Sequence, residues 1–250
     1  MGTEQRVTSN MEYRERTYRN RISKGNLTTF HVQVKETDLY ISADKNYNDI
    51  TLESVSKCRR NIEEYIKYRP IFLNSLTPIE KDEFAPPLVR DMIEASRICG
   101  VGPMASVAGA IARYVGTDLL EYSDNVIVEN GGDIFLKVVD NDARVGIFAG
   151  DSPLSYKIAL RIKAADTPVG ICTSSGTVGH SLSLGAADAV CVISESTPLA
   201  DAAATFIGNR VKRKGDIKRA LHAGSQITGI LGILIIVKDK LGAWGKIELI

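Results

Sequence analysis

The 250-residue chain has few of the side chains that build metal clusters or disulfide frameworks. It contains three histidines, and its four cysteines are scattered without a Cys-x-x-Cys pair. Neither a zinc cluster nor a disulfide framework is predicted, because both need such residues at short, regular spacing. Scattered free thiols are typical of a reducing compartment, so we expect a cytoplasmic protein.

Long apolar runs and an excess of one charge are missing as well. The longest late apolar run, ITGILGILIIV, is too short for a membrane-spanning helix, and no apolar segment follows Met1. The formal net charge is +1. Outside the N-terminal stretch Arg14 to Lys24, which we interpret as a solvated arm, we expect no strongly basic or acidic block. The composition therefore predicts neither a nucleic-acid nor a membrane partner.

The patterns that are present predict an α+β fold with mainly antiparallel sheets. Alternating residues in TTFHVQVKETDLYISAD predict an N-terminal strand pair. Helical spacing predicts an amphipathic helix that a capping Thr51 begins and that ends before Pro70, and a second helix over residues 88–98 that ends at Gly100. The stretch NVIVENGGDIFLKVV predicts a hairpin. Further strands are expected in VGIFAG, LRIKA, DAVCVI, GILIIVKD and the C-terminal GKIELI.

Two stretches of the chain resemble each other. PMASVAGAIARYVG from Pro103 and PLADAAATFIGNRV from Pro198 align without a gap at an offset of 95 residues. Each starts with proline, which suits a first helical position, and continues with small residues that allow a close approach. We predict a single domain of residues 1–250 built from two similar halves, about 1–150 and 151–250, although two Ala-rich helices also align by chance.

The second of these helices carries a candidate metal site. Asp201 and Thr205 are four residues apart and so share one helix face, which is otherwise lined by alanines. A carboxylate and a hydroxyl are hard oxygen ligands that suit Mg²⁺. The alternative is structural: Asp201 would complement the helix dipole and Thr205 would lie in the core.

Two glycine-containing segments are candidates for ligand binding. In ENGGDI, Gly131 and Gly132 serve a hairpin turn, but they also allow a ligand to approach bare backbone amides, while Asp133 is either a turn residue or part of a site. The segment CTSSGTVGHS offers hydroxyls and backbone amides that suit a phosphate or a flavin edge, or it is only a turn. Its candidate ligand-binding residues are Thr173, Ser174, Ser175, Gly176 and Thr177, and His180 is a candidate general acid or base.

Taken in order, NGGDI, CTSSG and ADAAAT resemble the ApbE superfamily, whose members take FMN from FAD with Mg²⁺ and attach it to a threonine or serine of a target protein. The longer pattern is similar to a separate, poorly characterised branch of that superfamily. The resemblance implies that Asp201 and Thr205 are metal ligands, completed by a backbone carbonyl near Ala105 to Ala108. It also implies that Gly131–Asp133 and Thr173–Gly176 lie beside a flavin nucleotide.

The chain departs from the flavin transferases at two points. The transferases carry a long insert with a catalytic histidine, whereas only 24 residues separate Gly176 from Asp201 here. Ala108 stands where the transferases have a lysine. His180 is then the remaining histidine that could act as the base.

These observations predict an ApbE-like protein that binds FAD or a related diphosphate with Mg²⁺. One hypothesis is a protein that is not a flavin transferase and serves a partner in sulfur incorporation or homocysteine formation, with which the branch is associated. The other is a Mg²⁺-dependent FMN transferase that uses FAD and a protein hydroxyl. In either case we expect a homodimer.

Overall fold

The computed structural model describes residues 27–176 and 185–250. They form an eight-stranded sheet in the order β1-β2-β3-β4-β7-β8-β9-β10 and a two-stranded sheet, β5-β6. All neighbouring strands run antiparallel, as predicted. The strands are β1 (Thr28–Val34), β2 (Thr37–Ala43), β3 (Val126–Asn130), β4 (Asp133–Lys137), β5 (Ala143–Gly146), β6 (Ala159–Ile162), β7 (Val169–Ser174), β8 (Ala189–Ser194), β9 (Ile230–Val237) and β10 (Lys240–Gly245).

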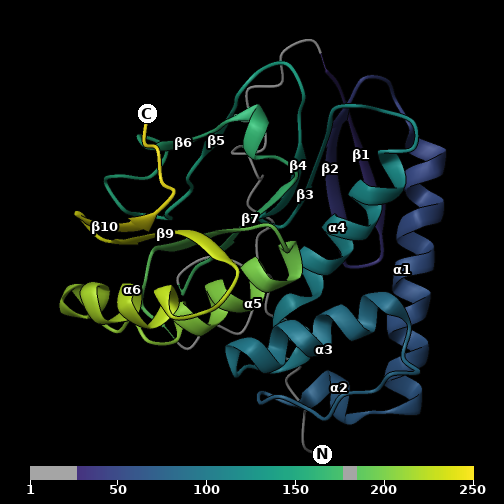
Figure 1. Cartoon of the computed structure of the whole chain (residues 1–250), viewed down its shortest axis with the longest axis horizontal. Helices are drawn as coiled ribbons and strands as arrows, with labels where there is room; N and C mark the ends of the chain where they lie inside the picture. The colour runs from purple at the N-terminus through teal and green to yellow at the C-terminus, as the bar shows by residue number, and fades with distance from the viewer. Residues whose placement is uncertain (1–26, 177–184) are drawn as a thin grey trace, which may run out of the picture.

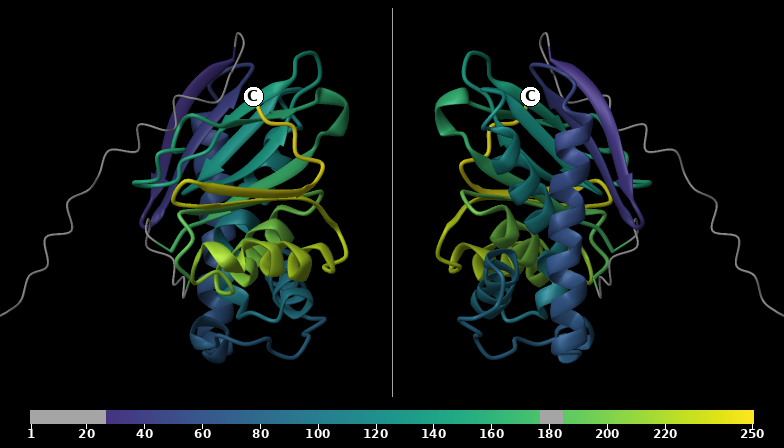
Figure 2. Two further views of the ribbon diagram at one scale, coloured as in Figure 1. Left: turned by 90° about the vertical axis from the view of Figure 1, so that its left-hand side faces the viewer. Right: turned by 90° about the vertical axis from the view of Figure 1, so that its right-hand side faces the viewer.

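The helices gather on one face of the large sheet, and β5-β6 packs on the opposite face (Figures 1 and 2). Among the described residues, no single helix is long and apolar enough to cross a membrane; the helical segments Pro87–Cys99 and Pro103–Leu119 pass that test only as a pair, which is bent by 105°. The helices are α1 (Asn48–Tyr68), α2 (Ile71–Asn74), α3 (Pro87–Cys99), α4 (Val107–Leu119), α5 (Thr197–Gly208) and α6 (Ile217–Ser225), with 3₁₀ turns η2 (Pro103–Ser106), η3 (Ala164–Asp166) and η4 (Lys214–Asp216).

Three apolar clusters follow from these layers. One lies between β1–β4 and helices α1, α3 and α4, and a second between β7–β9 and helices α5 and α6. The third fills the space between the large sheet and β5-β6. Because both faces of the central strands are covered, those strands are apolar on both sides; every residue of β8 is buried.

Each half of the chain contributes a hairpin, a set of helices and a second hairpin. In the first half, β1-β2 and β3-β4 flank α1–α4; in the second half, β7-β8 and β9-β10 flank α5 and α6. The β4-β7 ladder joins the two halves, from the pair Asp133 and Cys172 to the pair Leu136 and Val169. The same order of hairpins and helices in both halves fits an internal duplication. The duplication, and a boundary between the halves near residue 150, remain predictions.

The helix boundaries confirm most of the predictions. Helix α3 ends at Cys99, and Gly100 takes the left-handed conformation with φ of 69°, which a glycine adopts without a steric penalty. Helix α1 begins at Asn48, so the prediction that Thr51 caps it was wrong. The Thr51 hydroxyl lies inside the helix and donates to the Tyr47 carbonyl, 2.9 Å away.

The C-terminal prediction needs a correction. The strand is β10, from Lys240 to Gly245, whereas most of GKIELI follows it. The chain then turns toward β6, where Ala159 and Ile250 exchange backbone hydrogen bonds of 3.0 and 2.9 Å. The last residues therefore add to the small sheet, not to the large one.

Candidate functional site

The two glycines of the NGGDI motif form the tight turn between β3 and β4. Gly131 has φ of 68° and Gly132 has φ of 109°, both in the region that favours glycine. The turn is closed by the pair Asn130 and Asp133. The predicted hairpin is therefore confirmed, and Asp133 lies at the first position of β4.

The CTSSG motif runs directly beside this turn. Cys172 pairs with Asp133 across the β4-β7 ladder, and the Thr173 amide donates to the Gly132 carbonyl at 3.2 Å. A side chain on Gly132 would place its Cβ 3.6 Å from the Thr173 carbonyl oxygen. Ser174 ends β7, and Ser175 and Gly176 follow it. The structure thus brings together two motifs that are about 40 residues apart in the sequence.

A buried carboxylate under the turn changes one expectation. Glu129, which is 2% exposed, accepts a hydrogen bond from the Gly132 amide at its Oε1, 2.7 Å away. That amide is consequently not bare, so the alternative that the turn offers bare amides to a ligand does not hold for Gly132. Glu129 fixes the turn from the sheet face opposite to the helices, on which Ile127 also lies.

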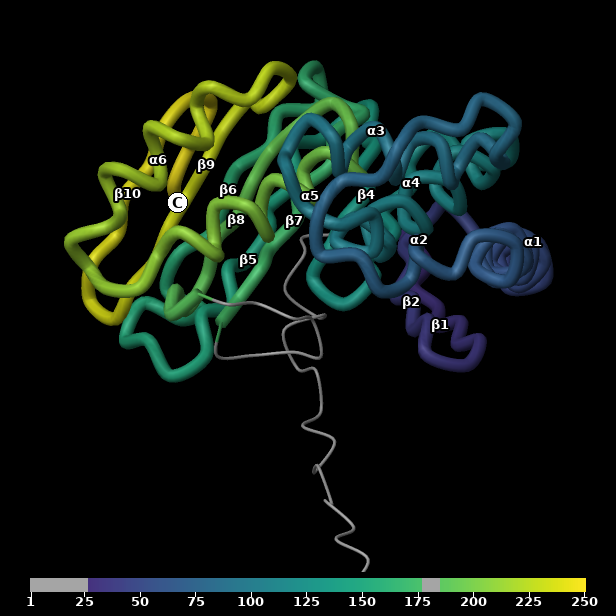
Figure 3. The backbone as a smooth tube through the Cα atoms, turned by 90° about the horizontal axis from the view of Figure 1, so that it is seen from below, coloured from purple at the N-terminus to yellow at the C-terminus, as the bar shows by residue number. Residues whose placement is uncertain are grey.

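Asp201 lies near these two motifs and belongs to helix α5, which packs beside α4 and over β7 (Figure 3). Its Oδ2 accepts a hydrogen bond from the Gly109 amide at 2.9 Å, and the Ala108 amide also bonds to the carboxylate. Both amides belong to the first turn of α4, where no intrahelical acceptor exists. Asp201 therefore caps α4 from another helix, which differs from the alternative that it only complements the dipole of its own helix.

Small residues make this contact possible. A Cβ on Gly109 would lie 2.7 Å from the Thr197 carbonyl oxygen and 2.9 Å from the Asp201 Cβ. Because such distances are shorter than real contacts, only glycine lets α4 and α5 approach this closely. The small residues were predicted to allow a close approach, and the structure shows that the neighbour is the other helix.

Two carboxyl groups and a thiol share this interior. Burial raises the pKa of Asp201 to about 7, although the Gly109 and Ala108 amides act against the shift. Burial, followed by the nearby Asp201 carboxylate, raises the pKa of Asp133 well above its usual value. The Cys172 thiol donates to the Thr197 carbonyl at 3.4 Å, and burial beside both acids raises its pKa. Burial and the like charge of the neighbouring acid thus both disfavour the ionised form of Asp133.

The residues predicted to hold Mg²⁺ fit that ion chemically. Asp201 and Thr205 are half-buried on one face of α5, whereas Ala202, Ala203 and Ala204 between them are buried. Within the described residues, no group of three or more His, Cys, Asp or Glu side chains could hold a metal, so the donors would be a carboxylate, a hydroxyl and a carbonyl. A carboxylate accepts about four hydrogen bonds or ligands, and two amides use only part of that capacity.

The Ala108 carbonyl lies within the segment predicted to complete the metal site. It accepts a hydrogen bond from the Asn130 amide group, 3.1 Å away. This bond ties the start of α4 to the GGD turn, and a carbonyl oxygen retains a second lone pair. The other two candidates, Thr177 and His180, lie outside the described residues.

Four further residues contact this site and were not predicted as site residues. Glu129 and Asn130 precede the two glycines of the turn, and Cys172 and Thr197 bond to each other beside Asp133 and Asp201. In the described part of the chain, the buried Thr197 hydroxyl has no hydrogen-bond partner. A polar residue within an otherwise apolar strand was the available signal for Glu129 and Asn130. The positions of Cys172 and Thr197 depend on tertiary packing.

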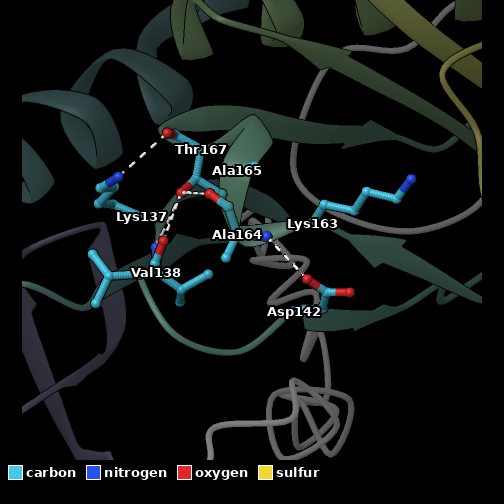
Figure 4. Close-up of a pocket in the computed structure, with 8 residues that line it drawn as sticks. Lys137, Val138, Asp142, Lys163, Ala164, Ala165 and Thr167 are labelled. Atoms are coloured by element: carbon cyan, nitrogen blue, oxygen red, sulfur yellow. Dashed lines mark hydrogen bonds between the residues drawn. The ribbon is translucent and has the colours of Figure 1, made fainter.

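A surface hollow elsewhere does not include the three motifs (Figure 4). It lies near the end of β4, the start of β5 and the turn η3, and one of its lining residues, Lys137, donates to the Thr167 carbonyl at 3.3 Å. Its lining residues are Lys137, Val138, Val139, Asp142, Lys163, Ala164, Ala165 and Thr167. None of the candidate site residues contributes to it.

The fold matches that of solved flavin transferases. It superposes on the apo form of the flavinyl transferase ApbE from Pseudomonas stutzeri with a TM-score of 0.58, 12% identity, and coverage of 88% of this chain and 94% of that one. The corresponding values for the ApbE protein from Thermotoga maritima are 0.57, 12%, 86% and 96%. At such identity the likeness shows an ApbE-like fold, and nothing more about chemistry.

Sequence comparison gives the family itself. The family model described as "AbpE bacteria" matches residues 19–241, and the chain belongs to that family. UPF0280 protein MJ1526 from Methanocaldococcus jannaschii is 43% identical over 220 residues, covering 86% of this chain and 89% of the relative. A UPF0280 protein from Methanococcus aeolicus is 41% identical over 222 residues, with the same coverage.

Proposed function

We propose that this protein binds a flavin nucleotide, such as FAD, or a related diphosphate together with Mg²⁺, and that it is not a flavin transferase. The ligand would lie along the GGD turn and the CTSSG strand end, and the metal at Asp201 and Thr205. The observation that carries the proposal is the meeting of these three motifs around the β4-β7 ladder and the start of α4.

The chain's own residues would have separate tasks in this site. Glu129 and Asn130 hold the turn and the start of α4 in place through the Gly132 amide and the Ala108 carbonyl. Asp201 and Thr205 would hold the metal, which neutralises negative charge on a diphosphate. A cation beside Asp201 would also favour its ionised form, which burial alone disfavours.

A Mg²⁺-dependent FMN transferase is the second candidate, because Asp201 and Thr205 are both present. In that reaction a hydroxyl of an acceptor protein attacks the FMN phosphorus of FAD, the diphosphate bond breaks, AMP leaves, and His180 takes the hydroxyl proton. The short spacing between Gly176 and Asp201, and Ala108 in place of a lysine, support the first candidate. A role beside a partner enzyme of sulfur incorporation, in a cytoplasmic homodimer, belongs to the same proposal.

Titration calorimetry with FAD, with and without Mg²⁺, tests the proposal. We expect binding that requires Mg²⁺ and weakens about tenfold or more in Asp201→Asn and Thr205→Val. Asparagine retains an oxygen that can accept the Gly109 amide bond, so Asp201→Asn removes the charge without removing the cap. Thr117→Val, on the exposed part of α4, is the matched control for the loss of a hydroxyl.

Equal FAD binding with and without Mg²⁺, or unchanged binding in both variants, would contradict the proposal. AMP release from FAD in the presence of a threonine-containing acceptor, lost in His180→Ala, would favour the transferase instead.

A further inference from the structure

Eight exposed cationic residues come from two segments at the end of the molecule opposite α1 (Figure 1). Six come from the connection between α5 and α6 and from the start of α6, and two from the turn between β9 and β10. We call them the basic surface: Arg210, Lys212, Arg213, Lys214, Lys218, Arg219, Lys238 and Lys240. Only two carboxylates, Asp216 and Asp239, lie among them in the sequence.

The basic surface is held in a defined shape. Asp216, which is 7% exposed, accepts hydrogen bonds from the Lys212 and Arg213 amides at 3.0 and 3.1 Å, and from the Arg219 side chain at 3.1 Å. An ion pair between Lys214 and Asp239 joins the two segments. The cations are therefore presented by an ordered backbone, which lowers the entropic cost of binding a partner.

The basic surface lies next to the candidate site. The Gly176 amide donates to the Ala187 carbonyl at 3.0 Å, and the Ala186 amide donates to the Val211 carbonyl at 2.7 Å. On the other side, the Lys238 amide donates to the Asp188 carboxylate. Both basic segments thus contact residues 186–188, which in turn contact the end of the CTSSG motif.

Two observations indicate the kind of partner. The chain as a whole has a net charge of +1, so the rest of the molecule is net acidic, unlike a nucleic-acid-binding domain with its high overall charge. No Phe, Tyr or Trp is present between Asn209 and Gly224, so this segment lacks the large aromatic side chains on which bases usually stack. Eight cations on two segments also exceed what one diphosphate needs.

We propose that the basic surface docks an acidic face or segment of a partner protein beside the candidate site. The contact would bring the partner to residues 186–188, within reach of whatever ligand lies along the CTSSG motif. The proposal does not depend on the identity of that ligand.

Binding of fluorescent poly-L-glutamate to the full chain, measured by anisotropy at low salt, tests this proposal. We expect saturable binding that weakens about tenfold or more in the triple variant Lys212→Glu, Arg213→Glu and Lys218→Glu, because reversed charges repel the probe. The control variant Lys57→Glu, Arg60→Glu and Lys67→Glu makes the same charge change on the exposed face of α1 and should bind nearly as the unmodified chain does. Thermal unfolding confirms that both variants fold.

Three results would overturn the proposal. The first is absent binding, or equal loss of poly-L-glutamate binding in both variants. The second is tighter binding of duplex DNA or poly(U) RNA than of poly-L-glutamate, which would make the basic surface a nucleic-acid site. The third is a matching loss of FAD affinity in the Lys212, Arg213 and Lys218 variant, which would assign these cations to the nucleotide.

Discussion

Gly109 is the single residue on which the approach of α4 to α5 depends most directly. Its missing side chain leaves room for the Thr197 carbonyl and lets its amide reach Asp201. The same glycine therefore sets both the packing of two helices and the position of a candidate metal ligand.

Gly109→Ala should lower the stability of the protein by about 1–3 kcal/mol, since the added methyl group meets backbone that must shift. This cost exceeds the gain of about 0.5–1 kcal/mol that alanine normally brings to a helix interior. Urea unfolding followed by circular dichroism measures the change. Gly215→Ala, where a Cβ would meet nothing within 4 Å, is the control and should stay within about 0.5 kcal/mol. An equal effect of both variants would contradict the prediction.

The four cysteines should be unreactive in the folded protein. Burial raises the pKa of Cys58, Cys99 and Cys191 to about 12, and that of Cys172 in the same direction. Because the thiolate is the reactive form, we expect Ellman's reagent at pH 8 to modify none of them until a denaturant is added. Rapid reaction of one thiol in the folded chain would show that its surroundings open.

Local chemistry decides which site residues can be predicted from the sequence. Gly131 and Gly132 were predictable because a two-residue hairpin turn needs positive φ. The bond from Glu129 to the turn was not, since it depends on which sheet face the side chain occupies. The pairing of Asp201 with the start of α4 joins residues more than 90 positions apart and required the folded structure.

The turn before α6 is an element that one carboxylate organises. Asp216 bonds to two backbone amides and to Arg219, and the Lys212 amide is the largest cause that lowers its pKa. Because the pKa of Asp216 is lower in the folded state than the unfolded value of 3.8, the ionised carboxylate stabilises the folded state at any pH above 3.8. That contribution is lost as the pH falls through the pKa of the folded state.

Asp216→Asn should therefore lower the melting temperature by a few degrees at pH 7, and the difference should shrink as the pH falls below about 4. Melting curves of both proteins across this range test the prediction. Asp140→Asn, at an exposed position between β4 and β5, is the control and should leave the curve unchanged. A difference that does not vary with pH would assign the effect to packing instead.

Most elements followed from periodicity, and the exceptions have physical reasons. The alternating and apolar runs predicted the strands, and Gly100 marked the end of α3. The start of α1 was misplaced because a threonine in the first turns of a helix can bond backward to a carbonyl as well as cap. The cations between Arg210 and Arg219 were readable in the sequence, contrary to the expectation that only the N-terminal segment is basic; their placement beside residues 186–188 was not.

At the scale of the whole molecule, the continuous eight-stranded sheet joins the two halves. Both halves leave an open strand edge when they are separated at the β4-β7 ladder, and the β5-β6 pair is divided as well. We expect the intact chain to unfold in one transition, and residues 1–150 or 151–250 alone to lack native structure. Calorimetry of the chain and proton NMR of each half test this, and an independently folded half would contradict it.

The β4-β7 ladder has one more consequence. The candidate site lies on the ladder that joins the two halves, with Asp133 in the first half and Cys172 in the second. A small molecule bound there would contact both halves and would oppose their separation at the β4-β7 ladder. Its binding free energy would therefore add to the free energy of unfolding of the whole chain. A thermal-shift screen of a compound library, which needs no assay of activity, is therefore well matched to finding the natural ligand.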